Sequence, residues 1–111
     1  MDRNNLIEGF HEAMLDIYRA AAEIGYYPSL FLRMVNDRGG LAAARQLIND
    51  ARPSEGFARL WELNRLDLSV EAVALREPWS QLFTPEELAS ARKRLEDHHF
   101  DPTKVSGPSA S

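Results

Sequence analysis

The chain has 111 residues, a formal net charge of −4 and no cysteine. Its length suits one domain with its own hydrophobic core, and the lack of cysteine excludes disulfides, thiolate metal sites and cysteine nucleophiles. The negative net charge argues against nonspecific binding of nucleic acid by the domain as a whole.

The sequence indicates a protein of the cytoplasm. Its first residues lack the basic and apolar run of a signal peptide, and no segment approaches the ~20 apolar residues of a membrane span. The absence of cysteine agrees with a reducing compartment. We therefore expect a cytoplasmic protein that does not bind membranes.

The first predicted helix spans residues 4–24. Gly25 follows it as a plausible left-handed C-terminal cap. Apolar residues recur three and four positions apart along the helix, which is the spacing of one helical face. The residues of this buried face are Ile7, Phe10, Met14, Ile17, Ala21 and Ile24.

Two short helices are expected next. Pro28 opens the first, residues 28–37, because its fixed φ suits the first turn of a helix. The second, residues 41–49, begins with small side chains that let a neighbouring helix approach closely. It ends before Pro53, since the residue preceding a proline is pushed out of the α region.

The stretch 53–73 contains two helix starts and the first of two tryptophans, so we expect the neighbouring elements to pack against it. Ser54 is a good N-cap for a fourth helix. Phe57, Leu60 and Trp61 lie on one face of that helix, which predicts that all three are buried.

A turn follows, in which Asp67 or Ser69 caps a fifth helix over residues 69–76. The residues 79–83 form a compact apolar turn that plugs the core. Thr84 then opens the last helix with a capping box, in which Glu87 is the third residue after the cap. This helix ends near Asp97 and carries Leu88, Ala91 and Leu95 inward.

These elements predict an all-α fold: a compact single domain of five or six short helices with a longer first helix, over residues 1–100. Residues 101–111 are rich in Pro, Gly and Ser and have little to bury. We expect them to form a flexible, disordered tail.

Several motifs occur in a fixed order along the chain. Tyr27-Pro28 and Gly39-Gly40 precede G-F-x-x-L-W-E-x-x-R-L-D-L-S-V-E-A over residues 56–72 and L-F-T-x-E-E-x-x-x-A-R-x-R-L over residues 82–95. In this order of motifs the chain resembles a family of short bacterial proteins of no assigned function. The resemblance implies a self-contained unit, and it brings no activity, substrate or catalytic residue with it.

Four residues are candidates for binding: Tyr27, Trp61, Arg65 and Asp67. For Trp61 and Asp67 we favour structural roles, in the core and as a helix cap. Arg65 either clamps Asp67 or Glu62 internally or faces a partner beside an exposed aromatic edge. Tyr26 and Tyr27, at a turn between helices, have the same two interpretations.

Two Glu-x-x-His pairs have the spacing that carboxylate metal sites use on helices, namely Glu8 with His11 and Glu96 with His99. Such a site needs two further carboxylates that point into a bundle core. Glu8 falls on the charged face of the first helix, and the second pair lies where the last helix frays. We expect solvated side chains at both places, and neither a metal nor another cofactor.

Arg94 and His99 are separated by four residues, which resembles the R-x4-6-H motif of all-helical HEPN ribonucleases. The resemblance implies that the pair, doubled across a dimer, handles a phosphate and a proton. Leu95 departs from the polar residue that this family favours after the arginine. A ribonuclease or toxin is therefore an alternative hypothesis for the function.

Two arginine clusters supply a further alternative, a nucleic-acid-binding accessory domain. We favour solvated faces paired with neighbouring acids instead. The clusters consist of Arg33, Arg38, Arg45 and Arg52 and of residues 92–94.

The sequence contains no nucleophilic triad, Walker loop or dinucleotide-binding fingerprint. We predict no catalytic residue and favour a small helical protein-interaction module of a bacterial cytoplasm, acting as an adaptor, inhibitor or regulatory subunit. Its expected partner is another protein, and a homo-oligomer remains open.

Overall fold

The computed structural model describes residues 2–102 of the chain. Within this range all regular structure is helical, so the predicted all-α class with a long first helix is confirmed. Most of the predicted tail lies outside the described residues. The elements are α1 (Arg3–Glu23), α2 (Ser29–Arg38), α3 (Gly40–Asn49), α4 (Glu55–Glu62), the 3-10 turn η1 (Leu66–Leu68), α5 (Val70–Ala74), the 3-10 turn η2 (Trp79–Leu82) and α6 (Pro85–Asp97).

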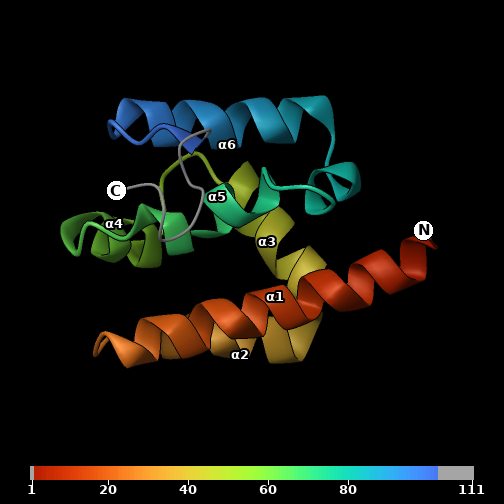
Figure 1. Cartoon of the computed structure of the whole chain (residues 1–111), viewed down its shortest axis with the longest axis horizontal. Coiled ribbons are helices and arrows are strands. Elements are labelled where there is room, and N and C mark those ends of the chain that lie inside the picture. Colours follow the sequence, from red (N-terminus) through yellow and green to blue (C-terminus); the bar gives the residue numbers. More distant parts are fainter. Residues whose placement is uncertain (1, 103–111) are drawn as a thin grey trace.

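The helices form two layers joined by α3 (Figure 1). In this view α1 and α2 lie at the bottom, α6 runs along the top, and α4 and α5 lie between them. α3 contacts α1 and α2 on one side and α5 and α6 on the other. α5 also contacts α1, α3 and α6, as expected for the second half of the stretch 53–73. α4, the first half of that stretch, lies at the edge of the molecule.

Small residues bring the backbones of α1 and α3 together, as the sequence predicted for the start of α3. Gly40, Ala43 and Ala44 are all buried. A Cβ atom on Gly40 would lie 2.7 Å from the Cα of His11, which is closer than real Cβ contacts. The ring of His11 completes the junction, because its Nδ1 accepts a hydrogen bond of 2.9 Å from the Gly40 N–H.

The larger of two hydrophobic clusters fills the space between α1, α2, α3, α5 and η2. The Phe10 ring packs edge-on against Trp79 and Phe83, with centroids 6.0 and 5.4 Å apart. The apolar turn around Trp79 therefore plugs the core as predicted. The smaller cluster joins α4 to α6 and consists of Phe57, Leu60, Leu66, Ala72 and Leu95.

The buried face of α1 differs from the predicted one at both ends. Leu6 is buried where Ile7 was expected, and Ile7 is only partly buried. Ile24 is exposed, because it is the C-cap residue beyond the last turn that packs on the core. The central residues of the predicted face are all buried.

Side-chain caps begin four of the helices. The Asp2 carboxylate accepts from the Asn4 N–H at α1, and the Ser54 hydroxyl accepts from the Phe57 N–H at α4. Ser69, and not Asp67, caps α5. Thr84 forms the predicted capping box of α6, with Glu87.

Three helices end in the same left-handed turn. After α1, α4 and α6 the chain passes through a residue with positive φ, namely Gly25, Asn64 and His99. In each case the next residue donates its N–H to the carbonyl five positions back, which satisfies a carbonyl of the last helical turn. Only Gly25 was predicted, since glycine is the residue that usually marks such a turn.

Residues 2–102 include no helix with the length and the apolar run that are needed to cross a membrane.

Candidate functional site

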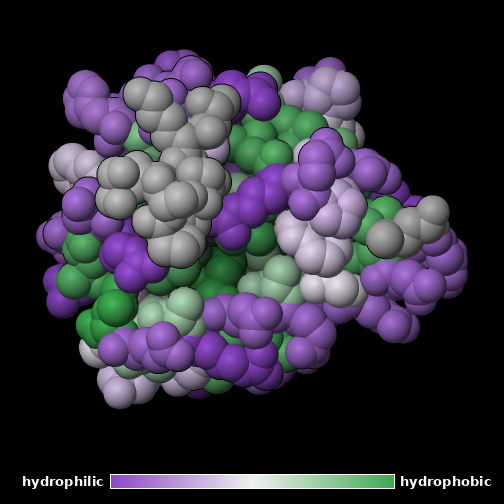
Figure 2. Space-filling model, in the orientation of Figure 1, coloured by the Kyte–Doolittle hydropathy of each residue, from purple (hydrophilic) through white to green (hydrophobic). Residues whose placement is uncertain are grey.

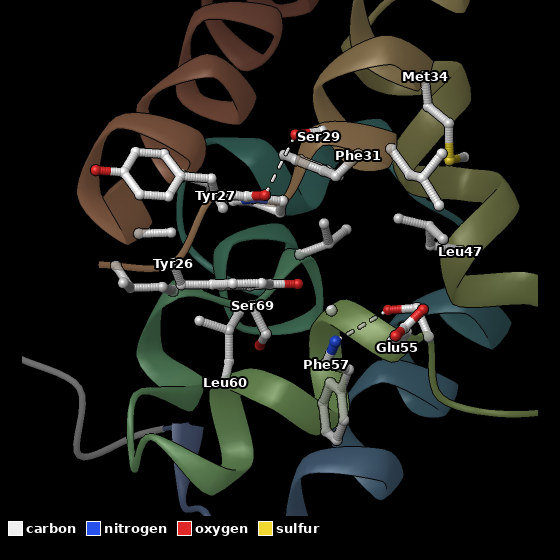
Figure 3. A pocket seen from close by; sticks show the side chains of 18 of the residues that line it. Tyr26, Tyr27, Ser29, Phe31, Met34, Leu47, Glu55, Phe57, Leu60 and Ser69 are labelled. Carbon is white, nitrogen blue, oxygen red and sulfur yellow. Dashed lines mark hydrogen bonds between the residues drawn. The ribbon is translucent and has the colours of Figure 1, made fainter. Parts of the chain in front are cut away.

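An apolar pocket of about 430 Å³ opens between the α1–α2 corner and the α4–α5 region. Figure 3 shows the residues that line it, and Figure 2 shows hydrophobic residues in the hollow between the two layers, bordered by hydrophilic ones. The walls come from the end of α1, from α2, from Leu47 of α3, from the first turns of α4 and from the segment that joins η1 to α5. Apolar side chains on these walls include Ile17, Phe31, Met34, Leu47, Phe57, Leu60, Leu68 and Val70.

The turn after α1 places two tyrosines at this pocket. Because Gly25 is left-handed, the Tyr26 N–H bonds back to the carbonyl of Ala21 at 2.9 Å, and the chain reverses toward α2. In Figure 3 the Tyr26 ring reaches across the pocket, whereas the Tyr27 ring points away from its centre. One tyrosine is therefore a wall of the pocket and the other lies on its rim.

The rim carries large side chains that are mostly exposed. Tyr27 keeps 62% of its surface accessible and Leu30 keeps 68%. Leu30 belongs to the first turn of α2, whose fully buried residue is Val35. The sequence did not identify Leu30 as a binding residue, because an apolar residue in an apolar helix is expected in the core.

Trp61 lines a second, adjoining hollow on α4. The helical spacing of Phe57, Leu60 and Trp61 predicted a core position for Trp61, and this was wrong, since half of its surface is exposed (50%). Phe57 and Leu60 take the positions of α4 that face the smaller cluster. Trp61 lies at the border of that face and packs edge-on against His98, with centroids 5.3 Å apart. α4 is at the edge of the molecule, so a residue at this border meets solvent.

Tyr26 and Glu55 line both hollows, so the apolar pocket and the hollow at Trp61 form one continuous surface. Burial raises the pKa of the Tyr26 hydroxyl, and the negative charge of Glu55 adds to this rise while Arg59 opposes it. The phenol therefore stays protonated at neutral pH. Its oxygen lies over the first turn of α4, 3.6 Å from where a Cβ of Gly56 would be.

Arg65 and Asp67 form a two-pronged ion pair and line neither hollow. The Nε and Nη2 atoms of Arg65 donate to the two carboxylate oxygens of Asp67 at 2.9 and 3.0 Å. Arg76 donates to the backbone carbonyl of Asp67 at 2.8 Å. The expected capping role of Asp67 is thus wrong, because its carboxylate is engaged by Arg65 and Ser69 caps α5 instead. This clamp fixes the η1 turn.

Arg94 is the structural centre of the upper layer. Its guanidinium lies 2.8 Å from the Glu71 carboxylate and also donates to the backbone carbonyls of Leu47 and Asp50. Burial raises the pKa of the Glu71 carboxyl, and the Arg94 guanidinium opposes that rise. His99, by contrast, is exposed in the turn after α6. The two residues of the ribonuclease-like motif therefore have different environments.

Glu87 holds α3 to the start of α6. One of its oxygens accepts from Arg45 at 2.9 Å and from Asn49 at 2.8 Å, and the other accepts from the Thr84 N–H at 2.9 Å. Burial alone would raise the pKa of Glu87, but these hydrogen bonds outweigh it and lower the pKa.

The predicted arginine clusters are divided among several partners. Arg45 pairs with Glu87, and Arg38 donates to the amide oxygen of Gln46. In the second cluster Lys93 pairs with Asp97 at the surface while Arg94 turns inward.

The part of the chain that the structure describes has no group of three or more His, Cys, Asp or Glu side chains that could hold a metal ion. Comparisons with models of protein families, with curated proteins and with solved structures give no match for this chain. Of the four predicted binding residues, the structure places Tyr27 and Trp61 on the continuous surface and Arg65 with Asp67 outside its lining.

Proposed function

We propose that the protein is a small interaction module that binds an apolar helical segment of another protein in this pocket and across the adjoining Trp61 hollow. The observation that carries the proposal is the apolar pocket whose rim exposes Tyr27 and Leu30. Large exposed apolar side chains beside a concave apolar site are typical of protein-binding surfaces.

The size of the site suits anchoring side chains. A volume of about 430 Å³ accommodates one or two large apolar side chains, and the Trp61 hollow offers a second contact point. An amphipathic helix presents apolar residues three and four positions apart, so its anchors can reach both hollows at once. Covering apolar surface contributes roughly 25 cal/mol per Å², so the exposed side chains of Tyr27, Leu30 and Trp61 would each contribute binding energy when a partner covers them.

The ribonuclease hypothesis is less favoured because the motif arginine already has a structural role. Arg94 forms an ion pair and two bonds to backbone carbonyls, so its substitution would perturb folding as well as any activity. His99 is exposed, and His99→Ala is therefore the clean variant. Cleavage of RNA by the natural chain that is lost in His99→Ala would reinstate this hypothesis.

Native mass spectrometry of the untagged protein, purified from its own host at modest salt, tests the proposed function. We expect a stoichiometric complex with another protein, and its loss in Leu30→Ser. The matched control is Arg92→Ser, since Arg92 is exposed on α6, in the other layer, and the substitution has a similar effect on helix propensity.

Cross-linking through a photoreactive residue at position 27 then identifies the partner segment. A complex that survives Leu30→Ser, or a chain that is always monomeric, contradicts the proposal. A homodimer that dissociates in Leu30→Ser would show that the pocket binds a second copy of this chain and not another protein.

A further inference from the structure

The charges around the pocket narrow the chemistry of its partner, and this inference rests on the proposed function. The lining of the pocket includes two charged residues, Glu55 and Glu71, and both are acids. The Glu71 carboxylate is matched by Arg94 at 2.8 Å. Glu55 is exposed in the first turn of α4 and makes no ion pair with any residue in the range 2–102. Among the described residues, the pocket therefore has one negative charge without an ion-pair partner.

The adjoining hollow does not supply a compensating positive charge. It contains Arg59 and Glu62, which pair with each other across 3.4 Å, together with Glu55 itself. Glu55 thus lies where the two hollows meet, and no residue in the described part of either lining forms an ion pair with it. Any partner that covers this point without a cation leaves a carboxylate with less access to water, which is unfavourable.

Tyr26 makes the same point attractive to a cation. Its ring lies between the two hollows, and Glu55 is close enough for its negative charge to raise the pKa of the Tyr26 hydroxyl. Lysine and arginine side chains bind to the faces of aromatic rings, and they bind better where a carboxylate lies beside the ring.

We infer that the partner segment carries a basic side chain next to its apolar anchor. The anchor enters the pocket, and the ammonium or guanidinium group lies at Glu55 against Tyr26. Because Glu55 is exposed, the resulting ion pair contributes orientation and selectivity more than affinity.

Two small aromatic probes of similar shape and opposite charge test this inference. Tryptamine carries an indole and an ammonium group, and 3-(indol-3-yl)propionate carries an indole and a carboxylate. Each is titrated into the ¹⁵N-labelled full chain at about 20 mM salt, and the shifts of the backbone amides of Tyr26, Leu30 and Gly56 are followed. Repeating the titration at about 500 mM salt screens exposed charges, because the Debye length then falls to a few Å.

We expect tryptamine to bind roughly fivefold more tightly than the propionate at low salt, as an exposed ion pair allows. The preference should fall toward unity at high salt and in Glu55→Gln. Glu86→Gln is the matched control, since Glu86 also lies exposed in the first turn of a helix and its substitution changes the net charge equally. This control should keep the preference.

The outcomes distinguish a failure of the basic partner from a failure of the proposed function. Equal binding of both probes, or a preference for tryptamine that persists in Glu55→Gln, contradicts the inference that the partner carries a basic side chain. The pocket would still be a binding site. If neither probe shifts the pocket amides, or if both act elsewhere, the pocket is not such a site and the proposed function fails with it.

Discussion

The Arg94 guanidinium and the Glu71 carboxylate lie 2.8 Å apart, with only 10% and 3% of their side chains exposed. They come from α6 and α5, and the guanidinium also bonds to the carbonyls of Leu47 and Asp50 near the end of α3. Three segments distant in sequence are therefore joined at one cation. Replacing both residues of a buried ion pair by apolar residues changes the stability of a protein little. Removing only one of them is costly, because the other charge is then buried without a partner.

Arg94→Met should destabilise the protein by about 3–5 kcal/mol, because it leaves the Glu71 carboxylate buried without its partner. Urea unfolding gives the free energy. The double variant Glu71→Met with Arg94→Met removes both charges and should lose less stability than Arg94→Met alone. A loss below about 1 kcal/mol in the single variant would show that the pair is not buried as described.

Glu87 should make the stability of the protein depend on acid pH. Its pKa is lowered in the folded state by the bonds from Thr84, Asn49 and Arg45, which exceed the effect of burial. The stabilisation is therefore complete above the ordinary value for Glu, 4.5, and is lost as the pH falls through the lowered pKa.

Glu87→Gln should accordingly be less stable than the natural chain at about pH 7, by about 1–2 kcal/mol. The difference should shrink as the pH falls through the lowered pKa of Glu87, because below it both chains carry an uncharged group at this position. Unfolding by urea at several pH values measures it. Glu86→Gln, an exposed neighbour, should show no comparable pH dependence, and a constant difference for Glu87→Gln would argue against this account.

Gly40→Ala should destabilise the protein by about 2 kcal/mol or more, because the new Cβ would lie 2.7 Å from the His11 Cα, where the backbone of α1 cannot yield. Gly56→Ala is the control. Its Cβ would meet the Tyr26 hydroxyl at an ordinary 3.6 Å, and alanine favours a helix, so stability should be unchanged or higher. Thermal unfolding of both variants compares the two sites, and an equal effect would contradict the close approach of α1 and α3.

Trp61→Ala should cost about 1 kcal/mol of stability, well below the roughly 3–5 kcal/mol expected for Phe57→Ala. The reason is the difference in exposure. Trp61 is half exposed and packs edge-on against His98, whereas Phe57 is buried in the smaller cluster. Urea unfolding ranks the two variants. If Trp61→Ala lowers the free energy of unfolding as much as Phe57→Ala does, Trp61 belongs to the core and is not available to bind a partner.

The sequence predicted those features that depend on nearby residues. The cap at Ser54, the capping box of Thr84 and Glu87 and the left-handed Gly25 were predicted because each is decided within about four positions of the chain. The long amphipathic α1 follows for the same reason. Asn64 was missed, since asparagine adopts many other conformations besides the left-handed one.

The candidate site could not be predicted, because it depends on residues that the fold brings together. Its walls come from the end of α1, from α2, from the end of α3 and from α4 to α5, and no local pattern shows that these segments meet. Trp61 was placed in the core because the periodicity of a helix shows which side chains share a face but not how far the core extends. Arg65 and Asp67 pair two positions apart in sequence, and the sequence did leave this clamp open as one alternative.

The three left-handed turns restrict how the length of this chain can vary. In each turn the backbone N–H of one residue bonds to a carbonyl of the preceding helix, which fixes the direction of that residue's side chain. Tyr26 lines the pocket, Arg65 reaches Asp67, and Phe100 packs on the smaller cluster. Inserting or deleting a single residue there would rotate the following chain and move the aimed side chain elsewhere. The exposed residues 51–53, between α3 and α4, lack such a turn. Related chains should therefore differ in length in this connection and keep a fixed number of residues between Ala21 and Ser29.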